Sequence, residues 1–101
     1  MGGAIRVFGE LPGAWRVGTR CDRLGYMLEG DGVLRGAASE WSEPLLPGSI
    51  QITPSGAPIV IMPEGPTVGG YPIAAVVHSD DLRLIAQTPA GDELRFDPAQ
   101  L

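Results

Sequence analysis

The sequence contains no lysine, and its seven positive charges, all of them arginines, are outnumbered by twelve aspartates and glutamates. The formal net charge at pH 7 is therefore −5. Proteins that bind nucleic acid need a basic surface to neutralise phosphates, so no nucleic-acid partner is expected. The acidic balance mainly favours solubility.

Cysteine and histidine occur only once each, as Cys21 and His78. One cysteine cannot form an internal disulfide, which argues against a disulfide-rich secreted domain and favours the reducing cytoplasm. No cysteine–histidine cluster has metal-ligand spacing, so no metal site is predicted. The longest apolar runs, 57–63 and 72–77, are too short to span a membrane, and the first ten residues lack the apolar core of a secretory signal.

Glycine and proline, in contrast, are abundant and separate short apolar segments along the whole chain. Fifteen glycines and ten prolines are spread over 101 residues, a length typical of one domain. This pattern indicates many turns between short strands. The predicted strands lie at 4–8, 14–17, around 26–28, from 33, and at 51–53, 58–62, 73–78 and 93–96.

One short helix is predicted between the last two strands. Ser79 is placed to cap its free N–H groups, and Asp80 and Asp81 suit the positive end of the helix dipole. Apolar residues follow at helical spacing, so the helix should span 80–87; they are Leu82, Ile85 and Ala86. An all-β fold with this one helix is expected to be a closed antiparallel β-barrel, since closure removes exposed strand edges. The tail after residue 96 is expected to fray.

Five segments resemble, in order and spacing, the C-terminal half of the biotin-dependent carboxyltransferase family. They are Asp22-Arg23-x-Gly25-Tyr26, Pro47-Gly48-x-Ile50-Gln51, Gly56-x-Pro58-Ile59, Thr67-x-Gly69-Gly70-Tyr71-Pro72, and Asp81-Leu82 with Ala86-Gln87. The family is also called allophanate hydrolase subunit 2. It includes the KipA-type proteins, which form the C subunit of ATP-dependent 5-oxoprolinase, and a region of urea carboxylase.

The resemblance implies a cyclophilin-like β-barrel, in agreement with the strand pattern. It also implies a component of a multi-subunit enzyme that opens 5-oxoproline to glutamate, or that transfers a carboxyl group to urea. ATP or biotin would then be the cofactor of the assembled enzyme, and a small amide or lactam its substrate. The implied partner is the KipI-type B subunit, with a relative of the A subunit as a further candidate. The alternative is a non-catalytic regulatory barrel that binds the KipI-type partner.

Three positions depart from the family pattern. Cys21 stands where serine is usual, Leu24 where methionine is common, and Ala90 where proline is common. The signature of the family's N-terminal half, Thr-Val-Gln-Asp-x-Gly-Arg, does not occur in the sequence. We therefore expect residues 1–101 to form one barrel domain, equivalent to the C-terminal part of a longer family and not active alone.

The candidate substrate-binding residues are Asp22, Arg23, Gln51, Thr67, Gly69, Gly70 and Tyr71. Free N–H groups beside glycine let an anionic or amide group approach the loop 67–72 closely, although the same glycines could simply let the chain turn. Arg20 and Arg23 offer guanidinium forks for a carboxylate or phosphate. Asp22 and Arg23 could instead lock each other within a tight loop.

The remaining candidates also have two interpretations. Gln51 could present its amide into the barrel mouth or make a hydrogen bond at a strand end. Tyr71 could stack on a flat ligand, whereas such a tyrosine is more often a core ring with its hydroxyl at the rim. His78 has no nucleophile partner in the sequence pattern, and the family's usual serine argues against a nucleophilic Cys21. No catalytic residue is assigned.

Overall fold

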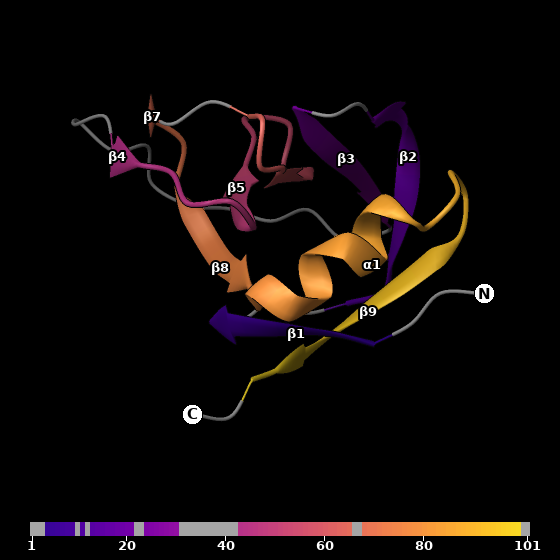
Figure 1. Ribbon diagram of the computed structural model, residues 1–101. Helices are drawn as coiled ribbons and strands as arrows, with labels where there is room; N and C mark the ends of the chain where they lie inside the picture. Colours follow the sequence, from indigo (N-terminus) through magenta and orange to yellow (C-terminus); the bar gives the residue numbers. More distant parts are fainter. Residues whose placement is uncertain are drawn as a thin grey trace.

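The computed structural model describes residues 4–9, 11, 13–21, 24–30, 43–65 and 68–99. Seven of its strands form one closed barrel in the order β1–β8–β5–β6–β3–β2–β9 (Figure 1). Their bounds are β1 Ala4–Gly9, β2 Trp15–Cys21, β3 Gly25–Gly30, β5 Ser49–Ile52, β6 Pro58–Ile61, β8 Ile73–Val77 and β9 Glu93–Pro98. Two short strands, β4 (Glu43–Pro44) and β7 (Val68–Gly69), pair with each other in a separate sheet.

The prediction of an all-β closed barrel is confirmed, with one difference in strand direction. Most neighbouring strands are antiparallel, but β1 and β9 run parallel, with Ala4 opposite Arg95. The predicted fraying of the tail is wrong as far as residue 99, because Asp97 belongs to β9 and the Ala99 N–H donates to the Val7 carbonyl at 2.7 Å. The strand expected from residue 33 lies outside the described residues.

Alternation along the strands places one set of side chains inside the barrel. Successive residues of a strand point to opposite faces, so the two apolar residues of β1, Ile5 and Val7, both face inward. The buried core cluster consists of Ile5, Val7, Leu11, Trp15, Val17, Leu28, Ile50, Val60, Met62, Ala75, Val77, Leu82, Ile85 and Leu94. The outward set on each strand is therefore available for other contacts.

A 3-10 turn, η1 (Ser79–Asp81), and a short helix, α1 (Leu82–Ala86), follow β8 (Figure 1). The helix packs Leu82 and Ile85 into the core, as their spacing predicted, whereas Ala86 is exposed. The predicted cap is wrong: Nδ1 of His78, rather than Ser79, accepts the free N–H of Asp80 at 3.2 Å. No helix within the described ranges is long and apolar enough to cross a membrane.

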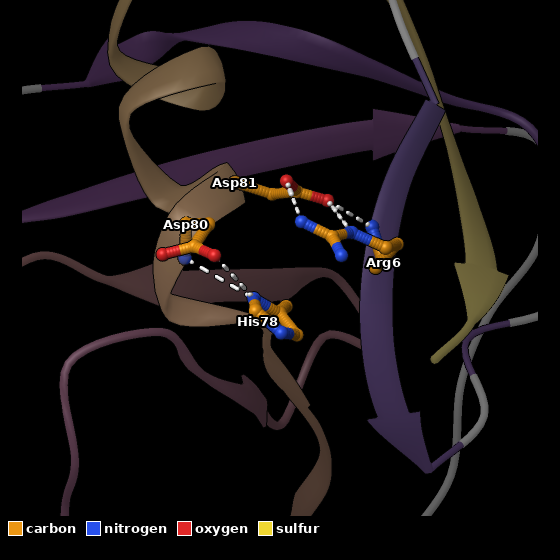
Figure 2. Close-up of polar contacts among 4 residues, drawn as sticks. All are labelled: Arg6, His78, Asp80 and Asp81. Atoms are coloured by element: carbon orange, nitrogen blue, oxygen red, sulfur yellow. Dashed lines mark hydrogen bonds and ion pairs between the residues drawn. The ribbon is translucent and has the colours of Figure 1, made fainter. Parts of the chain in front are cut away.

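Asp81 joins the helical segment to the first strand (Figure 2). Its Oδ2 accepts the backbone N–H of Arg6 at 2.8 Å and the Arg6 Nε at 2.9 Å, and its Oδ1 accepts Nη2 at 2.8 Å. Asp81 is only 7% exposed, which explains why its carboxylate needs these donors. The side-chain hydrogen bonds from Arg6 are the largest cause that lowers the pKa of Asp81 to about 2. The contact spans 75 positions of the sequence.

We expect Asp81→Ala to lower the free energy of unfolding by about 2 kcal/mol, because it leaves the Arg6 donors without their charged acceptor. Urea denaturation at neutral pH measures this loss. Asp80→Ala is the matched control, since the Asp80 side chain is 78% exposed and its removal should change stability by less than about 0.5 kcal/mol. Equal losses in the two variants would contradict the assignment.

The same carboxylate predicts a pH dependence of stability. The folded-state pKa of about 2 lies below the ordinary value of 3.8, so the contact stabilises fully above the ordinary value and is lost as the pH falls. The difference in unfolding free energy between wild type and Asp81→Ala should be constant at neutral pH and shrink between about pH 4 and pH 2. Urea titrations over this range test it, and a difference that persists unchanged at pH 2 argues against the mechanism.

Candidate functional site

The outer face of the sheet carries a row of side chains that runs across three neighbouring strands. Gln51 of β5 lies opposite Ile59 of β6, and Ile59 lies opposite Met27 of β3. The preceding residue Ile50 and its partner Val60 are fully buried in the core. Because neighbours in a strand face opposite sides, the Gln51 row points away from the barrel interior. Gln51 therefore lies on the outer face rather than in the barrel mouth.

An open cavity of ≈ 370 Å³ lies over this outer face. Its apolar lining comes from Leu24, Met27, Ile59 and Ile61. Its polar lining comes from Arg20, Gln51, Thr53 and Tyr71. An apolar hollow with a few polar groups is typical of a small-molecule site.

Two glycines shape the wall of the cavity. A Cβ at Gly25 would lie 3.1 Å from Cδ1 of Ile59, so the missing side chain leaves room for the Ile59 side chain. A Cβ at Gly65 would lie 2.3 Å from the Leu24 carbonyl oxygen, so only glycine lets the turn after β6 pack against Leu24. The Met62 N–H also donates to that carbonyl at 3.2 Å. These contacts hold Leu24 at the rim.

Gln51 is the unusual residue of this site. It is 5% exposed, and its buried Nε2 has no hydrogen-bond partner among the residues that the structure describes. Burying an amide without a partner costs roughly 1–3 kcal/mol in proteins. Ser49 on the same strand is also buried, but its Oγ accepts the Leu46 N–H at 3.1 Å. The fold thus gives the Ser49 hydroxyl a hydrogen-bond partner and leaves the Gln51 Nε2 donor available to a bound molecule.

The rim of the cavity is exposed and partly apolar. Tyr71 and Leu24 are each 47% exposed, so Tyr71 is not a core ring. Arg20 is exposed as well, and unlike Arg6 it forms no salt bridge with any carboxylate in the described part of the chain. A flat ring surface and a free guanidinium therefore border the cavity that contains Gln51.

The other predicted site residues have different outcomes. Asp22, Arg23 and Thr67 lie outside the described residues, so their roles stay predictions. Gly69 pairs with Glu43 in the small sheet and is not among the residues that line the cavity. Gly70 has no positive φ and has open space where a side chain would be, so no turn geometry explains it.

Sequence reasoning missed the apolar walls of the site. The run from Pro58 to Met62 is apolar without alternation, and this pattern is typical of a strand that is covered on both faces. That signal could have identified Ile59 and Ile61 as residues that face away from the core. Within the described residues, no group of three or more His, Cys, Asp or Glu side chains could hold a metal ion.

Comparison with known families agrees with the barrel and with the motifs on it. The family model described as "Carboxyltransferase domain, subdomain A and B" matches residues 8–98. The chain belongs to this carboxyltransferase family. The C subunit of 5-oxoprolinase from Escherichia coli (strain K12) is 37% identical over 83 residues, which are 81% of this chain and 27% of that protein. The C subunit of 5-oxoprolinase from Haemophilus influenzae (strain ATCC 51907 / DSM 11121 / KW20 / Rd) is 35% identical over 88 residues, which are 86% of this chain and 28% of that protein.

Two solved structures share the fold. The crystal structure of TTHA0988 matches 95% of this chain and 21% of its own, with a TM-score of 0.80 and 32% identity. The K. lactis urea amidolyase matches 96% of this chain and 7% of its own, with a TM-score of 0.82. At 22% identity the second likeness shows the fold alone. The chain spans 27–28% of the length of the curated relatives that it matches.

Removal of the unpartnered Gln51 amide is expected to increase the stability of the fold. Gln51→Leu should raise the free energy of unfolding by about 1 kcal/mol, because an apolar side chain replaces a buried donor that has no acceptor. Ser49→Ala, which removes a satisfied polar group from the same strand, should instead lower it by about 1 kcal/mol. Chemical denaturation of both variants makes the comparison. A loss of stability in Gln51→Leu comparable to that of Ser49→Ala would mean that the fold itself needs the amide.

Proposed function

We propose that this barrel forms a small amide- or lactam-binding cleft in an assembly of the 5-oxoprolinase type, in which it plays the part of the C-terminal barrel of the C subunit. The observation that carries the proposal is the buried, unpartnered Nε2 of Gln51 beside an apolar cavity. A carbonyl oxygen is the acceptor that such a donor lacks. Sites built around a buried polar group discriminate strongly against ligands that leave it unpaired.

The rest of the cavity suits a compact, planar ligand. The side chains of Met27, Ile59 and Ile61 give an apolar surface for ring carbons, and the exposed ring of Tyr71 can cover a flat face. A five-membered lactam combines such carbons with one carbonyl oxygen. The relatives named as the C subunit of 5-oxoprolinase support this substrate class for the chain.

A partner would complete the chemistry. No histidine, cysteine or acidic side chain lines the cavity within the described residues, so its lining offers the hydroxyl groups of Thr53 and Tyr71 but no imidazole, thiol or carboxylate. The exposed apolar rim at Leu24 and Tyr71 is a surface that a partner would cover. A relative of the KipI-type B subunit, together with a relative of the A subunit, would supply the reacting groups.

The cavity does not fit ATP. A triphosphate with its magnesium ion needs several N–H or cationic donors and an acidic metal ligand. Arg20 is the only cationic side chain in the described lining, and none of that lining is acidic. In the assembled enzyme ATP would therefore be bound elsewhere. The planar ureido group of biotin offers the same carbonyl acceptor as a lactam, so the cavity chemistry is compatible with biotin.

A regulatory role is the second candidate. The absence of imidazole, thiol and carboxylate groups from the described cavity lining favours it, because a barrel that only binds a KipI-type partner needs none. In that case the cavity would hold an amide or side chain of the partner instead of a substrate.

Reconstitution distinguishes the two candidates. The chain is mixed with relatives of the A and B subunits, and ATP-dependent formation of glutamate from 5-oxoproline is measured. We expect turnover, and we expect Gln51→Leu to lower kcat/KM by about tenfold or more, since one ligand hydrogen bond is lost.

Gln87→Leu is the control for that assay, because it makes the same chemical change at an exposed position after α1. It should leave turnover unchanged. A stable complex without turnover supports the regulatory candidate. Turnover that is insensitive to Gln51→Leu refutes the proposed cleft.

A further inference from the structure

A β-bulge interrupts β2 where this strand borders the cavity. Val17 pairs with Leu28 and Cys21 pairs with Tyr26, so three residues of β2 lie opposite the single residue Met27 of β3. The three are Gly18, Thr19 and Arg20. Bulges re-aim the side chains that follow them and are frequent next to binding sites.

Specific contacts hold this bulge. The Cys21 thiol donates to the Gly18 carbonyl at 3.1 Å and lies 3.6 Å from the Met27 carbonyl oxygen. A Cβ at Gly18 would lie 2.9 Å from that Met27 oxygen, so the close approach requires glycine. At the start of the bulge, Val17 exchanges two backbone hydrogen bonds with the 91–92 turn, at 2.7 and 3.0 Å. The bulge is therefore a defined part of the fold.

The bulge leaves Arg20 at the edge of the cavity. Arg20 lines it together with Met27 and Gln51, and it has no carboxylate partner within the described residues. It also borders an adjoining cavity of ≈ 490 Å³ that Glu29 lines. In a chain with a net charge of −5, a free guanidinium beside an apolar cavity is a local site for an anion.

Arg20 and Gln51 stand at opposite ends of the lining. Three strand spacings of about 4.8 Å separate β2 from β5 across β3 and β6, which is about 14 Å between backbones. Both side chains are long and share one cavity, so they leave room for a compact ligand between their polar ends. A guanidinium fork matches a carboxylate, and an amide N–H matches a carbonyl.

We propose that Arg20, aimed by this bulge, is a specificity-determining residue that selects carboxylate-bearing ligands in the Gln51 cavity. The inference rests on the proposed function and deepens it. The ligand class becomes a compact planar amide that carries a carboxylate, with its carbonyl oxygen at Gln51 and its carboxylate at Arg20.

A matched pair of ligands tests the role of Arg20 on the full chain without any partner. 5-Oxoproline and its carboxamide, 5-oxoprolinamide, differ only in the carboxylate, and NMR titration gives the Kd of each. We expect the wild type to bind the acid about tenfold more tightly, which is typical of one charge-assisted contact. Arg20→Ala should bring the ratio of the two Kd values to about one, and Arg20→Lys should restore part of the preference.

Arg16→Ala is the control, because Arg16 is also exposed and lies on β2 but does not line the cavity. It should keep the tenfold ratio. If both ligands bind equally well and Gln51→Leu weakens both, the Arg20 inference is overturned and the proposed cleft stands. If neither ligand binds, or if Gln51→Leu leaves both Kd values unchanged, the proposed function fails and the inference fails with it.

Discussion

Closure of the barrel depends on β9, the last strand, which pairs with β2 on one side and with β1 on the other. Without β9 the sheet would end in two open edges, at β1 and at β2. The buried core would also lose Leu94, which β9 contributes. The Arg6–Asp81 contact then fixes the segment after β8 against the closed wall (Figure 2). With the interior filled in this way, the outer face of β5, β6, β3 and β2 carries the candidate site.

The site differs from the rest of the described structure in how its buried polar group is hydrogen-bonded. Buried Ser49 and Asp81 are hydrogen-bonded, and their polar groups stabilise the fold. Gln51 is equally buried and keeps an unpartnered donor, while Tyr71 exposes an aromatic ring beside it. Proteins break local rules mainly at functional sites, where the cost is recovered in binding. This contrast on a single strand singles out the Gln51 cavity.

Local patterns predicted the strands well because hydrophobic alternation and turn residues act over a few positions. The inward set of β1 and the core positions of α1 follow directly from spacing. The cap was wrong because His78, a poor cap by propensity, sits where its Nδ1 reaches the Asp80 N–H. Of the site, Gln51 and Tyr71 came from a resemblance of motifs, and the structure places both at one cavity. The sequence offers Arg20 as a guanidinium fork for an anion, but it does not indicate the bulge that lies next to Arg20 in β2.

The sequence alone determined the all-β class, since apolar alternation and turn residues act locally, and the order of its motifs indicated the carboxyltransferase family. Only the tertiary structure decided three features. It made the β1–β9 pairing parallel, it joined Arg6 to Asp81 across 75 positions, and it brought Arg20 and Gln51 to one cavity. Each depends on contacts between segments far apart in the chain, where strand register and bulges, rather than local preference, set which side chains meet.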